Sequence, residues 1–208
     1  MFVGIAGIIG AGKTTLTQSL ADALGYEAYY EPVKENVYLG DFYTDMKRWG
    51  AMMQLYLLFK RFEQHQRLVW TTAKGAVQDR TIYEDTIFAK MLHDGGLIDD
   101  RDYETYTGHF SLMKRFLVYP DILIYLQVEP ETAFKRIQKR GRDVEQTITL
   151  DYLEQLHQGY EQFAEEMGRY TRVLTVDWNA YRPTAEVIEL VKAEMTNNLE
   201  FLRDLKRI

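Results

Sequence analysis

A glycine-rich segment near the N-terminus constrains this chain more than any other feature. Residues 7–14, Gly-Ile-Ile-Gly-Ala-Gly-Lys-Thr, fit the pattern G-x-x-x-x-G-K-[ST]. The apolar run 2–6 before the segment is typical of a buried strand, and residues 14–24 after it carry apolar side chains at helical spacing. Glycines let backbone N–H groups converge on a phosphate chain, and a helix N-terminus adds partial positive charge. The segment therefore predicts a phosphate-binding loop, in which Lys13 reaches the β- and γ-phosphates and the Thr14 hydroxyl ligates Mg²⁺.

Composition narrows the classes of protein that fit. The 208 residues suit one domain, 1–208, with a substantial core. The formal net charge of −6 argues against a general binder of nucleic acid or membrane, so an anionic ligand must meet a local cluster of positive charge. The lack of cysteine excludes disulfides and thiolate metal sites and fits a cytoplasmic location. No signal peptide precedes the first apolar run, and no run reaches the ~18 residues of a membrane span, so we expect no membrane contact.

Apolar runs alternate with long helical patterns along the chain, which indicates an α/β fold with a mainly parallel sheet. Besides residues 2–6, the runs typical of strands are 26–30, 75–80, 121–128 and 170–177. The helical patterns that follow the first helix cover about 44–70, 83–91, 99–119, 131–140, 149–167 and 184 onward. The order predicts a five-stranded parallel sheet flanked by helices.

Charged residues follow two of these strands. Pro32 favours extended geometry at Glu31, so the Glu31 carboxylate should lie at the carboxyl end of its strand. Asp79 and Arg80 end another strand as an acid–base pair. Open α/β sheets bind their ligands at this edge, so these side chains are candidates for chemistry.

A polar stripe marks the long helical pattern at about 44–70. Tyr43 and Gln54 are eleven residues apart, and Gln54 and Arg61 are seven apart. At ~3.6 residues per turn these spacings are close to three and two whole turns, so the pattern predicts that all three side chains face one way. A capping Tyr43 with a solvated Gln54 and Arg61 fits the same spacing equally well.

A cluster of positive charge follows the fourth apolar run. Arg136 and Arg140 share a helix face, and Arg142 follows within two residues. A transferring phosphoryl group needs such cations, because its negative charge must be held in line between donor and acceptor. Gly141 offers the hinge that a closing lid uses, so the pattern predicts an arginine-rich lid at about 136–147.

Taken in order, these residues resemble those of the deoxynucleoside kinases, the deoxycytidine/deoxyguanosine/deoxyadenosine kinase group, and above all its small bacterial members. The likeness runs nearly end to end. It rests on residues 7–15, Glu31-Pro32-Val33, Tyr43 with Trp49 and Gln54, Asp79-Arg80-Thr81-Ile82-Tyr83-Glu84-Asp85 and the run 136–146. A phosphate loop alone implies only a nucleoside triphosphate. The ordered set implies a P-loop kinase fold and an enzyme of nucleotide salvage, which transfers the γ-phosphoryl group of ATP to the 5′-hydroxyl of a deoxynucleoside.

The resemblance implies three catalytic residues. Glu31 would accept the proton of the 5′-hydroxyl, and Arg80 would hold the 5′-oxygen region and neutralise charge. Asp79 would be a second carboxylate near the hydroxyl or Mg²⁺, and the sequence leaves open which of the two acids is the general base. Thr14 and Asp79 are the implied metal ligands, Asp79 directly or through water.

The resemblance also implies two sets of binding residues. ATP would contact the phosphate loop, the lid and a segment after the last strand that borders the adenine, which together comprise Gly7, Ile8, Ile9, Gly10, Ala11, Gly12, Lys13, Thr14, Thr15, Arg136, Arg140, Arg142, Ala180, Tyr181 and Arg182. The deoxynucleoside would contact Glu31, Tyr43, Gln54, Arg61, Arg80, Asp85, Phe88 and Glu145. In the second set, Tyr43 and Glu145 would bind the 3′-hydroxyl and Gln54 would read the base edge.

The resemblance bears on the base as well. Arg61 and Asp85 match an arginine–aspartate pair that, in this family, goes with cytosine or purine substrates and whose loss goes with thymidine. Such a pair obstructs a thymine methyl, so the resemblance implies activity on deoxyadenosine, deoxyguanosine or deoxycytidine, with a leaning to deoxyadenosine, and poor activity on thymidine. The phenylalanine that flanks the base in the animal enzymes falls one residue later than Phe88, so Glu84 could stand in the place of Asp85.

Two other interpretations share part of the pattern. A nucleoside monophosphate kinase of the thymidylate-kinase type has the loop, the Asp-Arg pair and the lid, but Glu31, Tyr43 and Gln54 suit a neutral sugar hydroxyl rather than a phosphate. A non-catalytic P-loop nucleotide-binding module is the other alternative, although a GTPase would need an Asp-x-x-Gly motif after a strand and an Asn-Lys-x-Asp motif, and neither is found. The aromatic side chains of the segment 99–119 favour a homodimer.

Overall fold

Five parallel strands form the sheet within the residues that the structure describes. The structure is a computed structural model, and it describes residues 1–31, 36–71, 74–142, 145–180 and 182–205. The strands are β1 (Phe2–Ala6), β2 (Glu27–Tyr29), β3 (Ala76–Asp79), β4 (Ile122–Gln127) and β5 (Arg172–Asp177). Their order is β2-β3-β1-β4-β5, and every pairing is parallel, so all five carboxyl ends meet at one edge. This confirms the predicted five-stranded parallel sheet.

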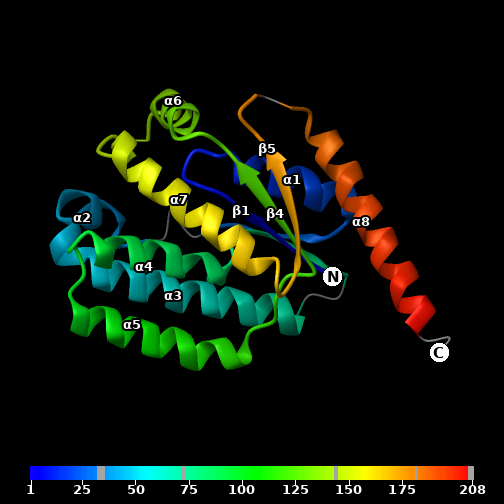
Figure 1. Ribbon diagram of the computed structural model, residues 1–208, viewed down its shortest axis with the longest axis horizontal. Coiled ribbons are helices and arrows are strands. Elements are labelled where there is room, and N and C mark those ends of the chain that lie inside the picture. Colours follow the sequence, from blue (N-terminus) through cyan, green and yellow to red (C-terminus); the bar gives the residue numbers. More distant parts are fainter. Residues whose placement is uncertain (32–35, 72–73, 143–144, 181, 206–208) are drawn as a thin grey trace.

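Helices cover both faces of the sheet. The α-helices are α1 (Lys13–Leu24), α2 (Leu39–Thr44), α3 (Met46–Thr71), α4 (Asp85–Asp94), α5 (Asp100–Met113), α6 (Pro130–Arg140), α7 (Leu150–Met167) and α8 (Thr184–Leu205). Two short 3₁₀ helices are η1 (Ile82–Glu84) and η2 (Lys114–Phe116). Figure 1 shows α3, α4, α5 and α7 grouped on one side of the sheet, and α1 with α8 on the other. In the part of the chain that is described, no helix is long and apolar enough to cross a bilayer.

The core explains why the central strands are apolar throughout. Every residue of β1 is buried, and β4 is buried from Ile122 to Leu126, because helices pack on both faces of these strands. Side chains on both faces of a covered parallel strand leave water, which favours runs of Ile, Leu and Val over an alternating pattern. The central strands therefore hold their carboxyl ends, and the loops that follow them, in fixed positions.

The predicted helix at about 44–70 begins at Met46, and a separate helix precedes it. The backbone turns at Asp45, with φ −146° and ψ 83°, so Tyr43 lies on α2 and not on α3 with Gln54 and Arg61. The break has a local cause, because the Asp45 side chain accepts a hydrogen bond from the backbone N–H of Arg48, at 3.0 Å. Asp is favoured at the start of a helix for this reason. Helical periodicity therefore cannot explain where Tyr43 lies.

The helical segment predicted at 99–119 is also shorter than expected. Helix α5 ends at Met113, η2 follows, and Leu117 is extended, with φ −96° and ψ 147°. The extended backbone lets the N–H of Val118 donate to Nε2 of the buried His65, at 3.1 Å. Satisfying a buried polar group in this way competes with one further helical turn.

Candidate active site

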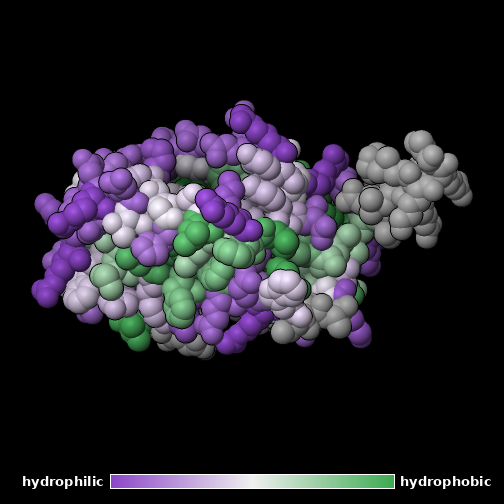
Figure 2. All heavy atoms as spheres, turned by 90° about the horizontal axis from the view of Figure 1, so that it is seen from below, coloured by the Kyte–Doolittle hydropathy of each residue, from purple (hydrophilic) through white to green (hydrophobic). Residues whose placement is uncertain are grey.

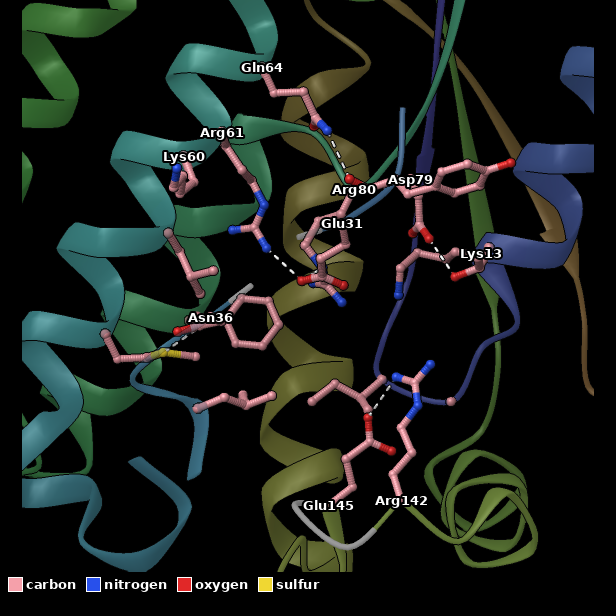
Figure 3. A pocket seen from close by; sticks show the side chains of 18 of the residues that line it. Lys13, Glu31, Asn36, Lys60, Arg61, Gln64, Asp79, Arg80, Arg142 and Glu145 are labelled. Atoms are coloured by element: carbon pink, nitrogen blue, oxygen red, sulfur yellow. Dashed lines mark hydrogen bonds and ion pairs between the residues drawn. The ribbon is translucent and has the colours of Figure 1, made fainter. Parts of the chain in front are cut away.

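One cavity at the carboxyl ends of the strands gathers most of the predicted site residues. Its volume is about 1100 Å³. The predicted residues that line it are Ile9, Gly10, Gly12, Lys13, Thr14, Thr15, Glu31, Tyr43, Gln54, Arg61, Asp79, Arg80, Phe88, Arg136, Arg140, Arg142 and Glu145. In Figure 3, Lys13 and Asp79 lie on one side of the cavity, Arg61 on the other, and Glu31 and Arg80 between them. Segments far apart in the sequence therefore meet around one space large enough for two small ligands.

The glycine-rich segment between β1 and α1 has the backbone of a phosphate cradle. Gly10 and Gly12 take positive φ values of 85° and 92°. A Cβ atom at Gly10 would lie 2.7 Å from the carbonyl oxygen of Ala133, so only glycine fits there. The Lys13 ammonium donates to the carbonyl oxygens of Gly7 and Ile8, at 2.9 and 3.0 Å. The loop thus wraps around the Lys13 side chain, and the start of α1 faces the cavity.

Lys13 carries an unusual charge environment. Burial lowers the pKa of its ammonium to about 8, and the nearby Arg80 acts in the same direction, while Asp79 and Glu31 oppose them. A bound polyphosphate would add negative charge next to this ammonium and favour its protonated form. The site is therefore chemically suited to an anion.

Thr14 and Asp79 join the phosphate loop to the end of β3. The Thr14 hydroxyl donates to Asp79 Oδ2, at 2.5 Å. Burial raises the pKa of Asp79, although Lys13 draws it down. In the segments that the structure covers, Asp79 Oδ1 is buried without a hydrogen-bond partner. A hydroxyl and a carboxylate with an unsatisfied oxygen beside a phosphate loop are ligands that suit Mg²⁺.

Glu31 lies between two buried guanidinium groups. Arg61 Nη2 from α3 is 2.6 Å from Glu31 Oε1, and Arg80 Nε from the end of β3 is 3.1 Å from the same oxygen. Burial by itself raises the pKa of Glu31, but the positive charges of Arg80, Arg61 and Lys13 outweigh burial and lower the pKa to about 2. The carboxylate is therefore ionised throughout the physiological range.

A second contact holds the strand that carries Glu31. Gln64 Nε2 on α3 donates to the carbonyl oxygen of Tyr30, at 2.8 Å, and Gln64 Oε1 accepts from Gln78 Nε2, also at 2.8 Å. Tyr30 directly precedes Glu31, and Figure 3 shows the Gln64 side chain pointing from α3 toward the part of the cavity where Glu31 lies. The two amides fix the carboxyl end of β2 against α3 and β3.

Arg61 pairs with Asp85 and not with Glu84. Arg61 Nη1 donates to Asp85 Oδ1, and both side chains are buried. Glu84 instead accepts from the backbone N–H of Thr81, at 2.7 Å, within the capping box of η1. Of the two acids that the sequence left open, Asp85 is therefore the partner of Arg61. Asp85 itself lies behind Arg61 and does not line the cavity.

Polar atoms without partners point to the ligand on this side of the cavity. Over the ranges that are described, Gln54 Oε1 and Arg61 Nε are buried and make no hydrogen bond. Buried polar atoms are normally hydrogen-bonded, so unpaired ones beside a cavity are suited to a polar ligand. Tyr43 also lines the cavity, and burial raises the pKa of its hydroxyl well above the usual value, which keeps it a neutral donor.

The predicted lid arginines have different partners. Arg140 Nη2 donates to Glu145 Oε2, and Arg142 Nη1 lies 3.2 Å from Glu145 Oε1. Arg136 on α6 instead donates to three backbone carbonyls, those of Trp178 at 2.6 Å, Asn179 at 3.1 Å and Ala11 at 3.5 Å. Arg136 thus connects the phosphate loop to the segment after β5, whereas Arg140 and Arg142 lie at the cavity on one shared carboxylate.

Some predicted residues lie outside the cavity wall. Gly7, Ile8 and Ala11 belong to the phosphate loop but lie behind its lining. Ala180 and Arg182 are exposed and do not line the cavity, and Arg182 Nη2 is 4.0 Å from Asp177 Oδ2. Tyr181 lies outside the described residues. The structure therefore brings together the phosphate loop and the charged residues, but not the segment expected to border the adenine.

Sequence reasoning missed two tyrosines of α7. Tyr152 lines the cavity, and Tyr160 contacts Arg80 from behind the lining. Both stand in an amphipathic helix, where a tyrosine normally packs in the core, so no pattern distinguished them. Only the tertiary structure identifies them, Tyr152 by its place in the cavity lining and Tyr160 by its contact with Arg80.

Comparison with known proteins points to one family. A family model described as deoxynucleoside kinase matches residues 3–200. The deoxyadenosine kinase of Dictyostelium discoideum is 45% identical over 192 residues, which are 92% of this chain and 78% of that protein. The deoxyadenosine/deoxycytidine kinase of Bacillus subtilis is 43% identical over 162 residues, 76% of this chain and 74% of that protein. A solved structure of deoxyadenosine kinase from M. mycoides, with the products dCMP and a flexible dCDP bound, is 35% identical and superposes with a TM-score of 0.84 over 95% of this chain and all of that one.

Proposed function

The chain belongs to the deoxynucleoside kinase family, and from that premise we propose that it transfers the γ-phosphoryl group of ATP to the 5′-hydroxyl of deoxyadenosine, with deoxycytidine and deoxyguanosine as further substrates. One observation carries the proposal: a phosphate cradle with Lys13 and a carboxylate held by two arginines face the same cavity. The cradle suits a triphosphate and the carboxylate suits a neutral hydroxyl. A monophosphate acceptor fits poorly, because Glu31 would repel it.

The donor triphosphate would lie on the phosphate loop. Its backbone N–H groups and Lys13 would hold the β- and γ-phosphates, and Arg140 and Arg142 would leave Glu145 to close over them as a lid. Thr14 and Asp79 would hold Mg²⁺, which neutralises charge on the phosphates when it is bound. The exposed Ala180 and Arg182 are the proposed neighbours of the adenine ring.

The acceptor hydroxyl would be activated by Glu31. As the 5′-oxygen bonds to the γ-phosphorus and the bond to the β-phosphate oxygen breaks, Glu31 accepts the hydroxyl proton and ADP leaves. Asp79 is the weaker candidate for the general base, because in this proposal its carboxylate holds Mg²⁺ with Thr14. The low pKa of Glu31 weakens it as a base, but phosphates beside Arg80 and Lys13 would offset their positive charge and raise that pKa. Arg80 would neutralise charge that develops near the 5′-oxygen.

The sugar and base would occupy the side of the cavity beside α3. Tyr43 and Glu145 would bind the 3′-hydroxyl, Gln54 would read the base edge, and Phe88 would pack on the ring. Arg61, fixed by Asp85, offers an unpaired Nε toward an amino- or keto-bearing base and leaves little room for a thymine methyl. Related kinases are named for deoxyadenosine and for deoxycytidine, which supports the same preference over thymidine.

We also propose a homodimer. Large apolar side chains are exposed on α3 and at the end of α5 and in η2, among them Met52, Phe59, Leu112 and Phe116. Figure 2 shows apolar side chains gathered near the middle of the face seen from below, where these helices lie. Contiguous exposed apolar surface is typical of an interface between proteins. Sedimentation should show a species of twice the monomer mass at micromolar concentration, and a monomer there would contradict the proposal.

Steady-state kinetics test the proposed function. The purified chain is assayed with ATP and Mg²⁺ against the four deoxynucleosides and against deoxyadenosine monophosphate. We expect the highest kcat/KM for deoxyadenosine, measurable values for deoxycytidine and deoxyguanosine, and poor turnover of thymidine. Release of ADP with the monophosphate but with none of the deoxynucleosides would overturn the proposed function, and substantial turnover of thymidine would overturn the proposed base preference.

A further inference from the structure

Arg80 has a strained backbone that the rest of the structure must hold in place. Its φ is 66°, and among the described residues it is the only one other than glycine with a positive φ. An arginine in this region has no local hydrogen bond to favour it, so the strain persists only where side-chain contacts over-determine the conformation. Arg80 is buried, with 2% of its surface exposed, and it directly follows β3.

The contacts of the Arg80 guanidinium come from both of its ends. Nε lies 3.1 Å from Glu31 Oε1 at the cavity. Nη1, on the far side, donates to the hydroxyl of Tyr160 on α7 and lies 3.9 Å from Glu84 Oε2. Tyr160 is fully buried and does not line the cavity, so a substrate in the cavity has no direct contact with it.

The Tyr160 hydroxyl is itself held in one direction. It donates to Glu84 Oε2, at 2.8 Å. Glu84 is anchored in turn, because its Oε1 accepts from the backbone N–H of Thr81 at 2.7 Å and from the Thr81 hydroxyl at 3.3 Å. With its proton given to Glu84, the tyrosine oxygen presents lone pairs to Arg80. The direction of each hydrogen bond in the chain is therefore determined.

Aromatic rings complete the enclosure of Arg80. Its guanidinium carbon lies 4.7 Å from the centre of the Phe88 ring and 5.9 Å from that of Tyr160. The Tyr160 ring stacks on Tyr125 of β4, with centroids 6.2 Å apart and planes inclined by 6°. These rings enclose the planar guanidinium, whose Nε lies toward Glu31.

We propose that Tyr160 is a positioning residue of the phosphoryl transfer: with Glu84 behind it, its hydroxyl fixes the Arg80 guanidinium so that Nε meets Glu31 at the reacting hydroxyl. This rests on the proposed function, in which Arg80 and Glu31 act at the 5′-oxygen. Tyr160 acts through Arg80 alone and touches neither substrate. It should therefore affect the rate of the chemical step and leave binding of both substrates almost unchanged.

Tyr160→Phe tests this role, and Tyr125→Phe is a matched control. Both substitutions remove one hydroxyl from the same stacked ring pair, but the Tyr125 hydroxyl donates to Glu161, away from the cavity. We expect Tyr160→Phe to lower kcat by about tenfold with KM values for ATP and deoxyadenosine changed less than about twofold, since Arg80 loses a charge-assisted hydrogen bond that orients it while neither substrate loses a contact with Tyr160. Tyr125→Phe should keep the normal kcat. A normal kcat in Tyr160→Phe, or an equal loss in both variants, would overturn the proposal.

A double-mutant cycle separates positioning from a general structural role. If Tyr160 acts through Arg80, then Tyr160→Phe should lower kcat less than about twofold in an Arg80→Lys background, because lysine cannot present the same planar fork. Tyr125→Phe should have the same small effect in both backgrounds. A full tenfold loss in the Arg80→Lys background would show that Tyr160 acts independently of Arg80.

Two further measurements keep the proposal separable from the proposed function. The Arg80 Nε–H signal in NMR spectra should be sharp in the wild-type chain and in Tyr125→Phe and broadened in Tyr160→Phe, whatever the enzyme phosphorylates. A sharp signal in Tyr160→Phe would overturn the positioning role even if the chain phosphorylates deoxynucleosides. If Tyr160→Phe does not fold, Glu84→Gln weakens the hold on Arg80 both through the tyrosine hydroxyl and through the direct ion pair of Glu84 with Nη1, and it should lower kcat by about threefold without changing KM. An unchanged kcat in that variant would count against the proposal.

Discussion

The two sides of the cavity are built by different means. The loop side, residues 7–15, uses backbone groups and consecutive residues between β1 and α1. The ion-pair side, made of Glu31, Arg61, Arg80 and Asp85, uses charged side chains that come from the segment after β2, from α3, from the end of β3 and from α4. The loop side therefore depends on local conformation, whereas the ion-pair side depends on the packing of four elements.

The difference teaches where each side is sensitive to change. A backbone cradle tolerates many side chains but no Cβ atom at its tightest glycine, as at Gly10. Buried charges tolerate neighbours of many shapes but need their partners, because an unpaired buried ion is costly. Loss of one carboxylate on the ion-pair side leaves two arginines facing each other, whereas loss of one glycine on the loop side displaces the phosphates.

The largest expected effect comes from removing the charge of Glu31. Glu31→Gln keeps the size of the side chain but lacks a carboxylate to accept the hydroxyl proton, so we expect kcat to fall by a factor on the order of 10²–10⁴. ATP affinity should stay within about twofold, because the loop side makes its contacts without Glu31. Steady-state kinetics with deoxyadenosine and calorimetric titration with ATP measure the two quantities.

Glu154→Gln is the control for this variant. Glu154 is exposed on α7, so the same substitution there should leave turnover unchanged. Near-normal turnover in Glu31→Gln would move the base role to Asp79. A parallel loss of ATP affinity would contradict the separation of the two sides.

The next largest effect concerns the loop side, where a substitution should weaken ATP binding and leave deoxyadenosine binding almost unchanged. In Gly10→Ala the new Cβ meets the Ala133 carbonyl at 2.7 Å and the Ile137 side chain at 3.0 Å, with φ at 85°. The left-handed conformation costs a non-glycine residue roughly 1–2 kcal/mol. At about 1.4 kcal/mol per factor of ten, strain and clash together should weaken ATP binding at least tenfold. Binding of deoxyadenosine alone, measured by calorimetry, should change less than about twofold because its contacts lie across the cavity.

Gly96→Ala separates the clash from the strain. Gly96 has a similar φ of 69°, and no atom lies within 4 Å of the added Cβ. This variant should lose some thermal stability and bind ATP normally. Equal loss of ATP affinity in Gly10→Ala and Gly96→Ala would mean that the cradle around Gly10 is not the donor site.

The same comparison explains how much the sequence could predict. The loop side could be predicted from the sequence because its residues are consecutive and their order alone defines the turn. The alternation of apolar runs and helices predicted the five-stranded parallel sheet, since a covered strand must be apolar throughout. Glu31, Asp79 and Arg80 could be placed at the edge formed by the carboxyl ends of the strands, because each stands where a strand ends.

The ion-pair side was only partly predictable. Periodicity predicted that Tyr43, Gln54 and Arg61 face one way. All three line the cavity, but Tyr43 does so from α2, because the Asp45 cap separates α2 from α3. The choice between Asp85 and Glu84 as the partner of Arg61 needed the orientation of η1, which depends on a capping box and not on spacing. Tyr160 gave no signal, because its role comes from a side-chain contact with Arg80, 80 residues away in the sequence. Contacts between distant segments are set by tertiary packing, which local patterns do not encode.

The smallest expected effect is a difference in pH dependence between the two sides. Lys13 on the loop side has a pKa of about 8, lowered by burial, and a polyphosphate binds best to its protonated form. Below pH 8 the Lys13 ammonium is charged, and ATP affinity changes little with pH. Above pH 8 Lys13 must take up a proton when ATP binds, so ATP affinity should fall by about eightfold between pH 7.5 and 9. Glu31, with a pKa of about 2, stays ionised across this range, so deoxyadenosine affinity should stay constant.

Calorimetric titrations of each ligand across the range measure both slopes, and Lys13→Arg, whose guanidinium stays charged, should abolish the decline for ATP. A wild-type ATP affinity that is flat from pH 7.5 to 9, or a deoxyadenosine affinity that falls in parallel, would contradict the assignment of Lys13 to the donor phosphates.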